Sequence, residues 1–313
     1  MGISNTQVHG ALDEPHGTPD PPFMTSMGIH MSANSNACFQ YSRADFQLIQ
    51  DDCISAMDSM RKESFDLIIA DPPYNLSQPR RSNAIATLST LKKFTMVQED
   101  WDTFSLEEYR SFTECWISSA MRLLKPTGSL FVFGTHHNSG IVNTVLQEKS
   151  VNIKTEITWY KRNAMPNLSG TGLGASTETI IWATKTKKPI FNYERMKNYP
   201  DDLFHKQGKQ MRNIWDICTS RSECVDHPTQ KPVALYERII DMTCPKNGRI
   251  LDPFAGSGTL GVASSFMGKR CVMIEREEKY CQVILDRVFE HFLKALPKET
   301  LQHIVETCTH RAA

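Results

Sequence analysis

The sequence predicts an α/β fold with an open, mostly parallel sheet and helices on both faces. Continuous apolar runs such as FDLIIA (65–70) and SLFVFG (129–134) are typical of strands that are buried on both faces. Segments with apolar residues at helical spacing alternate with these runs, as LEEYRSFTECWISSAMRLL (106–124) does. A strand, a glycine turn and a helix follow one another in RILDPFAGSGTLGVASSF (249–266).

The first half of the chain yields the following elements in order. Residues 1–36 lack a hydrophobic period and are predicted to be a disordered tail. FQLIQDDCISAMDSM (46–60) indicates a strand, an acidic turn and a helix, and the strand FDLIIA follows. A long polar loop is expected at 77–100, before the helix at 106–124. KPTG ends that helix, SLFVFG is the next strand, and two further strands are NIKTEITWYK (152–161) and TETIIWATK (177–185).

The second half begins with a weakly patterned region at about 186–226 that mixes basic and aromatic residues. PVALYERIIDMTC (232–244) indicates a helix, RCVMIE (270–275) a strand and EEKYCQVILDRVFEHFLKAL (277–296) a final helix. We therefore predict one catalytic domain at 37–296, with a target-recognition region at about 186–226 and a C-terminal tail at 297–313.

Composition limits the classes of function. The 313 residues are 40% hydrophobic, which is enough for a large core, and the 35 basic residues balance the 35 acidic ones. A surface for nucleic acid must therefore be a local patch. No apolar run approaches the ~20 residues of a membrane span, and the N-terminus lacks the layout of a signal peptide. The nine cysteines show no C-x-x-C spacing, which favours reduced core thiols of a cytoplasmic protein over metal ligands.

The glycine turn LDPFAGSGT (251–259) is suited to a ligand. Gly256 and Gly258 allow a sharp turn with close backbone approach, and the following helix N-terminus favours an anionic group. Glu275 ends the next strand, where a carboxylate suits ribose hydroxyls. The alternative for Glu275 is an acid that stabilises the start of the helix at 277–296.

The segment DPPY (71–74) directly follows a buried strand, where ligands bind in open parallel sheets. The two prolines fix the backbone and keep their carbonyl oxygens as acceptors, so Asp71 and a carbonyl can clamp an exocyclic amine while Tyr74 stacks on a base. The alternative is a stiffened turn with a buried tyrosine. A second copy, DPPF (20–23), has no strand before it and is not expected to function.

DPPY and FAGSG together resemble the DNA amino-methyltransferases, which transfer a methyl group from S-adenosylmethionine to adenine N6 or cytosine N4. DPPY precedes the glycine turn, an order that resembles the family's β class over roughly 38–290. DDC (51–53), RLLKPTGSLFVF (122–133) and HPTQKP (227–232) resemble further segments of that class. The resemblance implies a Rossmann-like methyltransferase fold with a circularly permuted motif order.

The resemblance also implies roles for single residues. Asp71 would accept a hydrogen bond from the target amine, and the carbonyl oxygen of Pro72, which precedes Pro73, would be the second acceptor. Tyr74 would stack on a flipped base. The implied cofactor-binding residues are Asp52, Asp71, His227, Lys231, Asp252, Phe254, Gly256, Gly258, Thr259 and Glu275.

Among the implied cofactor contacts, Asp52 would hold the amino group of the cofactor adenine and Glu275 its ribose. Lys231 would neutralise the cofactor carboxylate. Asp252 has two readings, a contact to the methionine amine or a residue that shapes the turn.

DNA contact is expected in the loop 77–100 and in the region 186–226, because Lys and Arg outnumber Asp and Glu by about two to one between Lys154 and Arg221. A solvated surface is the alternative. The candidate DNA-binding residues are Arg80, Arg81, Lys92, Lys93, Lys161, Arg162, Lys206, Lys209 and Arg212.

The expected activity is site-specific methylation of adenine N6 in double-stranded DNA, since an initial Asp with Tyr favours adenine in this family, and cytosine N4 is the alternative. Three other functions are disfavoured. RNA and protein-glutamine methyltransferases place the cofactor loop before the catalytic motif, which is the opposite order. An inactive homologue should have lost Asp71 or a loop glycine, and a dehydrogenase would not account for DPPY. A restriction endonuclease and a second copy of the chain are the further partners considered. The place of action would be the cytoplasm, at the nucleoid in a bacterium.

Overall fold

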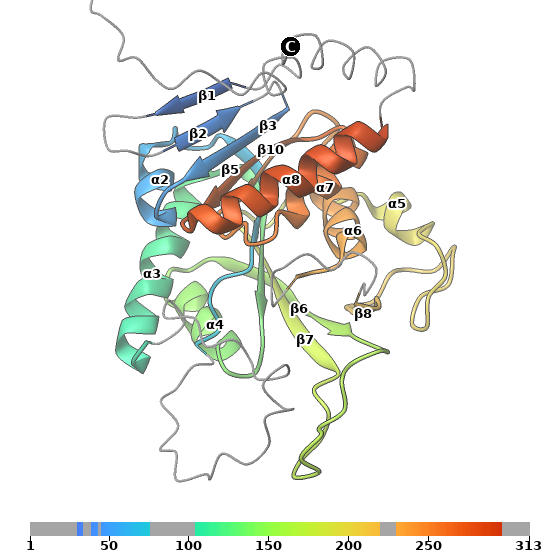
Figure 1. The fold of residues 1–313 in the computed structure, drawn as a ribbon. Coiled ribbons are helices and arrows are strands. Elements are labelled where there is room, and N and C mark those ends of the chain that lie inside the picture. Colours follow the sequence, from blue (N-terminus) through green and yellow to red (C-terminus); the bar gives the residue numbers. More distant parts are fainter. Residues whose placement is uncertain (1–29, 34–38, 43–44, 76–103, 220–229, 296–313) are drawn as a thin grey trace, which may run out of the picture.

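The computed structural model describes residues 30–33, 39–42, 45–75, 104–219 and 230–295. The strands in these residues form a single ten-stranded sheet, and helices cover both of its faces (Figure 1). The strands are β1 (His30–Ala33), β2 (Phe39–Ser42), β3 (Phe46–Gln50), β4 (Phe65–Ala70), β5 (Leu124–Gly134), β6 (Asn152–Tyr160), β7 (Thr177–Thr184), β8 (Ile214–Asp216), β9 (Arg249–Asp252) and β10 (Arg270–Glu275). The helices are α2 (Cys53–Ser59), α3 (Leu106–Leu123), α4 (Ser139–Glu148), α5 (Tyr193–Lys197), α6 (Val233–Thr243), α7 (Thr259–Phe266) and α8 (Glu278–Ala295).

The centre of the sheet is parallel and contains the point where the strand order reverses. The order is β1-β2-β3-β10-β9-β4-β5-β7-β6-β8, and the pairs from β3 to β5 are all parallel. From β9 the chain proceeds outward to β10, whereas from its neighbour β4 it proceeds the other way to β5. Ligands bind at the carboxyl ends of strands at such a reversal, so the ends of β4 and β9 mark the expected site.

Two helical layers enclose the sheet because successive side chains of a strand point to opposite faces. In β4, Leu67 and Ile69 pack with α6, α7 and α8, while Ile68 and Ala70 pack with α2, α3 and α4. All six residues of β4 are buried, as the unbroken apolar run predicts. The α/β fold with a mostly parallel sheet and helices on both faces is confirmed.

Helix α3 shows how the sequence sets an element's limits. Ser105 accepts a hydrogen bond from the Glu108 backbone N–H, and the Glu108 side chain accepts one from the Ser105 N–H, which makes a capping box. Tyr109, Trp116 and Leu123 are buried along one face. The chain then passes directly into β5 at Leu124, so the turn expected at KPTG is instead the first part of the strand.

Several local expectations require correction. His30–Ala33 forms β1 and pairs with β2, although it lies inside the span 1–36 that was predicted to be a disordered tail. The strands β6 and β7 run antiparallel to each other, and β7 runs antiparallel to β5, so this edge departs from the parallel pattern. Cys115 and Cys218 are exposed rather than core residues.

No helix in the described part of the chain has the length and apolar character needed to cross a membrane.

Candidate active site

A pocket opens at the carboxyl ends of β4 and β9, where the topology places it. Its walls come from the DPPY segment, the glycine turn after β9, the turn before α2 and the end of β10. The lining residues include Asp51, Asp52, Asp71, Pro72, Pro73, Tyr74, Phe104, Phe112, Lys231, Tyr236, Phe254, Gly256, Thr259, Ile274, Glu275 and Tyr280. The structure therefore brings together most of the residues that the sequence singled out. His227 lies outside the described residues, as does the second copy of the motif at 20–23.

The backbone of the DPPY segment is held from α3. The Tyr109 hydroxyl donates a hydrogen bond of 2.8 Å to the Pro73 carbonyl oxygen and accepts one of 3.2 Å from Asn138 Nδ2. Tyr109 and Asn138 are both fully buried. No donor among the described residues reaches the Pro72 carbonyl oxygen. The prolines and this anchor leave one rigid acceptor, that of Pro72, at the pocket.

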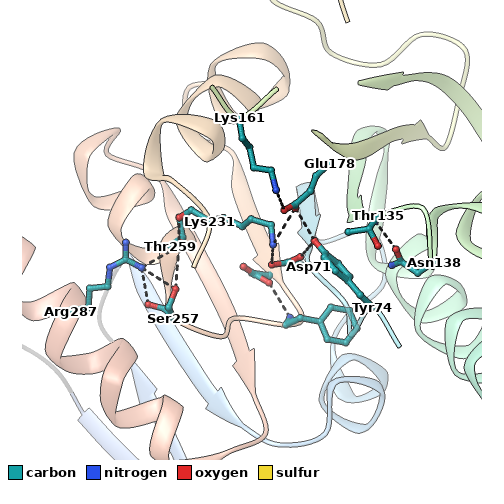
Figure 2. Close-up of polar contacts among 12 residues, drawn as sticks. Asp71, Tyr74, Thr135, Asn138, Lys161, Glu178, Lys231, Ser257, Thr259 and Arg287 are labelled. Carbon is teal, nitrogen blue, oxygen red and sulfur yellow. Dashed lines mark hydrogen bonds and ion pairs between the residues drawn. The ribbon is translucent and has the colours of Figure 1, made fainter. Parts of the chain in front are cut away.

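Both carboxylate oxygens of Asp71 have partners within the site. Oδ1 accepts a hydrogen bond of 2.6 Å from the Tyr74 hydroxyl, and Oδ2 lies 2.6 Å from Lys231 Nζ. Glu178, at the start of β7, lies 3.5 Å from the Tyr74 hydroxyl and 3.8 Å from Lys231 Nζ. Its other oxygen contacts Lys161 Nζ at 2.9 Å. Figure 2 shows these five side chains pointing toward one another.

Burial and the neighbouring charges together set the pKa values in this cluster. Burial would lower the pKa of Lys231, but the carboxylates of Asp71 and Glu178 outweigh it, so that its pKa is raised. Lys231 therefore remains an ammonium group. Burial and the same two carboxylates raise the pKa of Tyr74 well above its usual value. The Tyr74 hydroxyl accordingly stays protonated and acts as a donor to Asp71.

The position of Lys231 bears on the role implied for it. The resemblance implies a contact with the cofactor carboxylate. In the structure the Lys231 side chain is 5% exposed, and its ammonium group forms an ion pair with Asp71. Its backbone carbonyl accepts a hydrogen bond of 3.1 Å from the Thr259 hydroxyl at the start of α7. Lys231 thus joins the DPPY segment to the glycine turn.

The glycine turn is fixed by two side chains from elsewhere. Glu275 Oε2 accepts a hydrogen bond of 2.9 Å from the Gly256 N–H, and Oε1 accepts one of 2.9 Å from the Glu277 N–H. Arg287, buried on α8, donates to the Ser257 carbonyl at 3.0 Å and to the Thr259 hydroxyl at 3.1 Å (Figure 2). Glu275 supports the turn before α8, as one of its two expected roles requires, and it also lines the pocket, while its contact with a ribose stays a prediction.

Asp52 combines a structural role with its place on the pocket wall. It is the N-cap of α2, and its Oδ1 accepts hydrogen bonds from the N–H groups of Ile54 at 3.0 Å and Ser55 at 3.1 Å. The Asp52 N–H itself donates to Asp51 Oδ1 at 2.7 Å. This capping fixes the direction of the carboxylate at the pocket.

Asp252 is the most perturbed acid near the pocket. It ends β9, is 1% exposed, and accepts a hydrogen bond of 3.0 Å from the Phe254 N–H through Oδ1. Its Oδ2 is buried and finds no hydrogen-bond partner in the described part of the chain. Burial, with the nearby carboxylates of Asp71 and Glu275, raises its pKa to about 8. At neutral pH this carboxyl therefore keeps its proton, and a cationic ligand group such as an ammonium beside Oδ2 would favour its ionised form.

Asp252→Asn should stabilise the fold, and the gain should grow with pH. The native carboxyl titrates near pH 8 and the unfolded one near 3.8, so the native state keeps a proton that the unfolded chain releases between these values. The proton's contribution to native stability is complete below the lower pKa and is lost as pH rises toward the upper one, by at most about 1.4 kcal/mol per pH unit. Urea unfolding of both proteins at about pH 5.5 and about pH 8 measures this. A gain that does not change with pH would contradict it.

The candidate DNA-binding residues fall into three groups. Arg80, Arg81, Lys92 and Lys93 lie outside the described residues. Lys206, Lys209 and Arg212 are exposed near β8, with Lys206 Nζ 3.2 Å from Asp201, and Arg162 forms an ion pair of 2.8 Å with buried Asp216. Lys161 differs, because its side chain is 15% exposed and pairs with Glu178. Its contact with a phosphate stays a prediction, while the structure places its ammonium group beside the Asp71, Tyr74 and Lys231 cluster.

Sequence patterns missed three supporting residues, which are Glu178, Arg287 and Tyr109. Glu178 carried the only usable signal, an acid at the start of an otherwise apolar strand. Arg287 and Tyr109 look like ordinary members of amphipathic helices, and only the folded chain brings them to the turns that they anchor.

Comparisons with known proteins identify the family of the chain. A family model described as DNA methylase, N6_N4_Mtase, matches residues 65–286. The Type II methyltransferases M2.LlaDCHI of Lactococcus lactis subsp. cremoris and M2.DpnII of Streptococcus pneumoniae are each 38% identical over 255 residues, covering 79% of this chain and 91% of the relative. The solved M1.HpyAVI–SAM complex is 26% identical with a TM-score of 0.57, covering 78% of this chain and 98% of the other. The chain therefore belongs to the N6/N4 DNA methylase family, the S-adenosylmethionine-dependent DNA amino-methyltransferases.

Proposed function

We propose that this enzyme methylates the exocyclic N6 of adenine in double-stranded DNA, at a specific site, after the base has left the helix stack. The observation that carries the proposal is that Asp71, Pro72 and the glycine turn line one pocket. Two acceptors held by rigid backbone suit an amine with two N–H donors. A base inside a duplex cannot reach such a pocket, so it must be extruded.

The chain positions the nucleophile rather than activating it strongly. Asp71 and the Pro72 carbonyl accept the two N–H bonds of the amine and orient the nitrogen lone pair toward the cofactor side. Because Lys231 holds Oδ2 at 2.6 Å, the oxygen for the amine is Oδ1, which the Tyr74 hydroxyl must release. This release frees the Tyr74 ring to stack on the base. Most of the rate then comes from alignment of nitrogen and methyl carbon.

The pocket residues fit the cofactor. When bound, S-adenosylmethionine supplies an electrophilic methyl group on a sulfonium sulfur. Asp252, with its unpartnered buried oxygen, would hold the ammonium of the methionine part. Glu275 and Asp52, on the pocket wall, would hold the ribose and the adenine amine. Phe254 packs edge-on against Trp116, with ring centroids 5.5 Å apart, and forms the apolar side of the pocket with Phe112.

The region around β8 is proposed to contact DNA, as part of one catalytic domain at 37–296. Exposed Lys209 and Arg212 would contact phosphates, which gives affinity without sequence information. A cognate restriction endonuclease and a second copy of the chain are proposed partners. Methylation would take place in the cytoplasm, on nucleoid DNA if the source is bacterial.

The experiment is long-read sequencing of DNA from a methylation-free host that expresses this chain, with Asp71→Ala as the control. N6-methyladenine at one sequence motif, lost in the control, would support the proposal and identify the target site. N4-methylcytosine at one motif would keep the clamp and overturn the choice of base. Absence of both marks would refute methylation of duplex DNA by the chain alone.

A further inference from the structure

The loop between β6 and β7 exposes three large apolar side chains. Met165 is 54% exposed, Leu168 66% and Leu173 97%. The sequence from 163 to 177 contains no charged residue, which is unusual for a solvent-facing loop. Large apolar side chains that gather on one exposed segment indicate a binding surface.

The loop has an internal structure of its own. The Gly170 N–H donates to the Asn167 carbonyl at 3.2 Å, and Gly170 has a φ of +65° that favours glycine. The Ser169 hydroxyl donates to Asn167 Oδ1 at 2.6 Å and lies 2.6 Å from the Thr171 hydroxyl. At the base, the Lys161 N–H donates to the Ser176 carbonyl at 2.8 Å. These bonds form a turn that presents its apolar side chains outward.

The base of the same loop belongs to the active site. Lys161 directly follows β6 and Glu178 is the second residue of β7. They form an ion pair of 2.9 Å, and Glu178 joins the hairpin to Tyr74 and Lys231. Figure 2 shows both residues beside Asp71, and Figure 1 shows the hairpin extending well beyond the sheet. The hairpin that carries the apolar tip is therefore joined at its base to Tyr74 and Lys231, which line the pocket.

DNA is the partner that this position indicates. At the base of the hairpin, the ring of Tyr160 lies 5.8 Å from that of Phe204, in the segment that also carries Lys206, Lys209 and Arg212. Those cations suit phosphates, whereas an uncharged apolar tip suits the space between bases, where Leu, Met and Pro side chains insert in proteins that unstack DNA. The loop carries these residue types in Met165, Pro166, Leu168 and Leu173.

We propose that the loop 163–176 enters the target duplex and that Leu173, supported by Leu168 and Met165, fills the space that the extruded base leaves. This inference rests on the proposed function, because it presumes extrusion. Filling that space raises the fraction of bound DNA in which the base is extruded. The effect is therefore large where a base pair must be broken, and small where the target has no partner.

The test measures single-turnover methyl transfer at saturating enzyme by wild type, Leu173→Ala and the control Phe266→Ala. Phe266 is also a large exposed apolar residue, at 56%, but lies at the end of α7. One duplex carries the matched target, and a second carries the target base opposite an abasic position. We expect Leu173→Ala to be about tenfold slower on the matched duplex and within about twofold of wild type on the second. Phe266→Ala should match wild type on both.

Equal rates of Leu173→Ala and wild type on the matched duplex would overturn the proposal, as would equal losses on both duplexes. A second readout does not depend on methyl transfer. The fluorescence of 2-aminopurine at the target position rises when the base leaves the stack, and Leu173→Ala should reduce that rise. If wild type transfers no methyl group to either duplex, the proposed function fails, and the 2-aminopurine signal alone decides whether the loop extrudes the base.

Discussion

Replacing Asp71 with alanine should abolish methyl transfer while leaving cofactor binding within a few-fold of the natural enzyme. Alanine removes both carboxylate oxygens, so the target amine loses one of its two acceptors and its lone pair is no longer aligned. Losing a positioned group at the reacting atom lowers rates by about 10³-fold or more. The measurement is single-turnover methyl transfer to duplex DNA, with cofactor affinity from calorimetry of the same samples.

The loss of Asp71 has a second effect that must be separated from the first. Alanine leaves the buried ammonium of Lys231 without its partner at 2.6 Å, and among the described residues the acid left within ion-pair distance is Glu178 at 3.8 Å. An uncompensated buried charge destabilises a fold by several kcal/mol. The double variant Asp71→Ala with Lys231→Met removes that charge and should regain most of the lost stability. It should remain inactive, because no carboxylate faces the amine.

Asp71→Asn separates charge from shape. Asparagine keeps the size of the side chain and one acceptor oxygen, which its amide can present to Lys231. Its NH₂ group then faces the target amine, donor against donor. We expect activity between those of the natural enzyme and the alanine variant. Full activity of the alanine variant would refute the assignment of Asp71 to the clamp.

The sequence predicted the parts of the site that are local in the chain. DPPY and the glycine turn are continuous segments, and each directly follows an apolar strand whose burial the residue types predict. Glu275 was also predictable, since it ends the strand after the glycine turn. Such features depend on neighbouring residues and on the rule that ligands bind where parallel strands end at a reversal of strand order.

Other parts depend on contacts between distant segments and could not be predicted in this way. Glu178 and Asp71 are 107 positions apart, and only the antiparallel insertion of β7 beside β5 brings Glu178 to the site. Lys161 was named as a DNA contact because basic residues outnumber acidic ones in its region, and the sequence did not show that it pairs with Glu178. Both features went unseen for one reason, since the pairing partner of a charged residue far along the chain cannot be read from the sequence.

Replacing Gly256 with valine should prevent cofactor binding, with an affinity loss of about 100-fold or more. Gly256 has a φ of +52°, a conformation that costs about 1–2 kcal/mol for a residue with a Cβ and more for a β-branched one. Its N–H donates to Glu275 at 2.9 Å, so a shift of the turn also moves the carboxylate proposed to hold the ribose. The backbone at this point lines the pocket, and a side chain there would occupy cofactor space.

The control for Gly256→Val is Gly268→Val, which separates backbone strain from damage to the pocket. Gly268 has a φ of +58° and open space around the position of a Cβ, in the turn between α7 and β10. Both variants should therefore lose similar stability, measured by urea unfolding without cofactor. Only Gly256→Val should lose cofactor affinity, measured by calorimetry. An equal loss of affinity in both would show that strain alone, transmitted through α7 and β10, weakens the site, and the direct role of the Gly256 turn would be refuted.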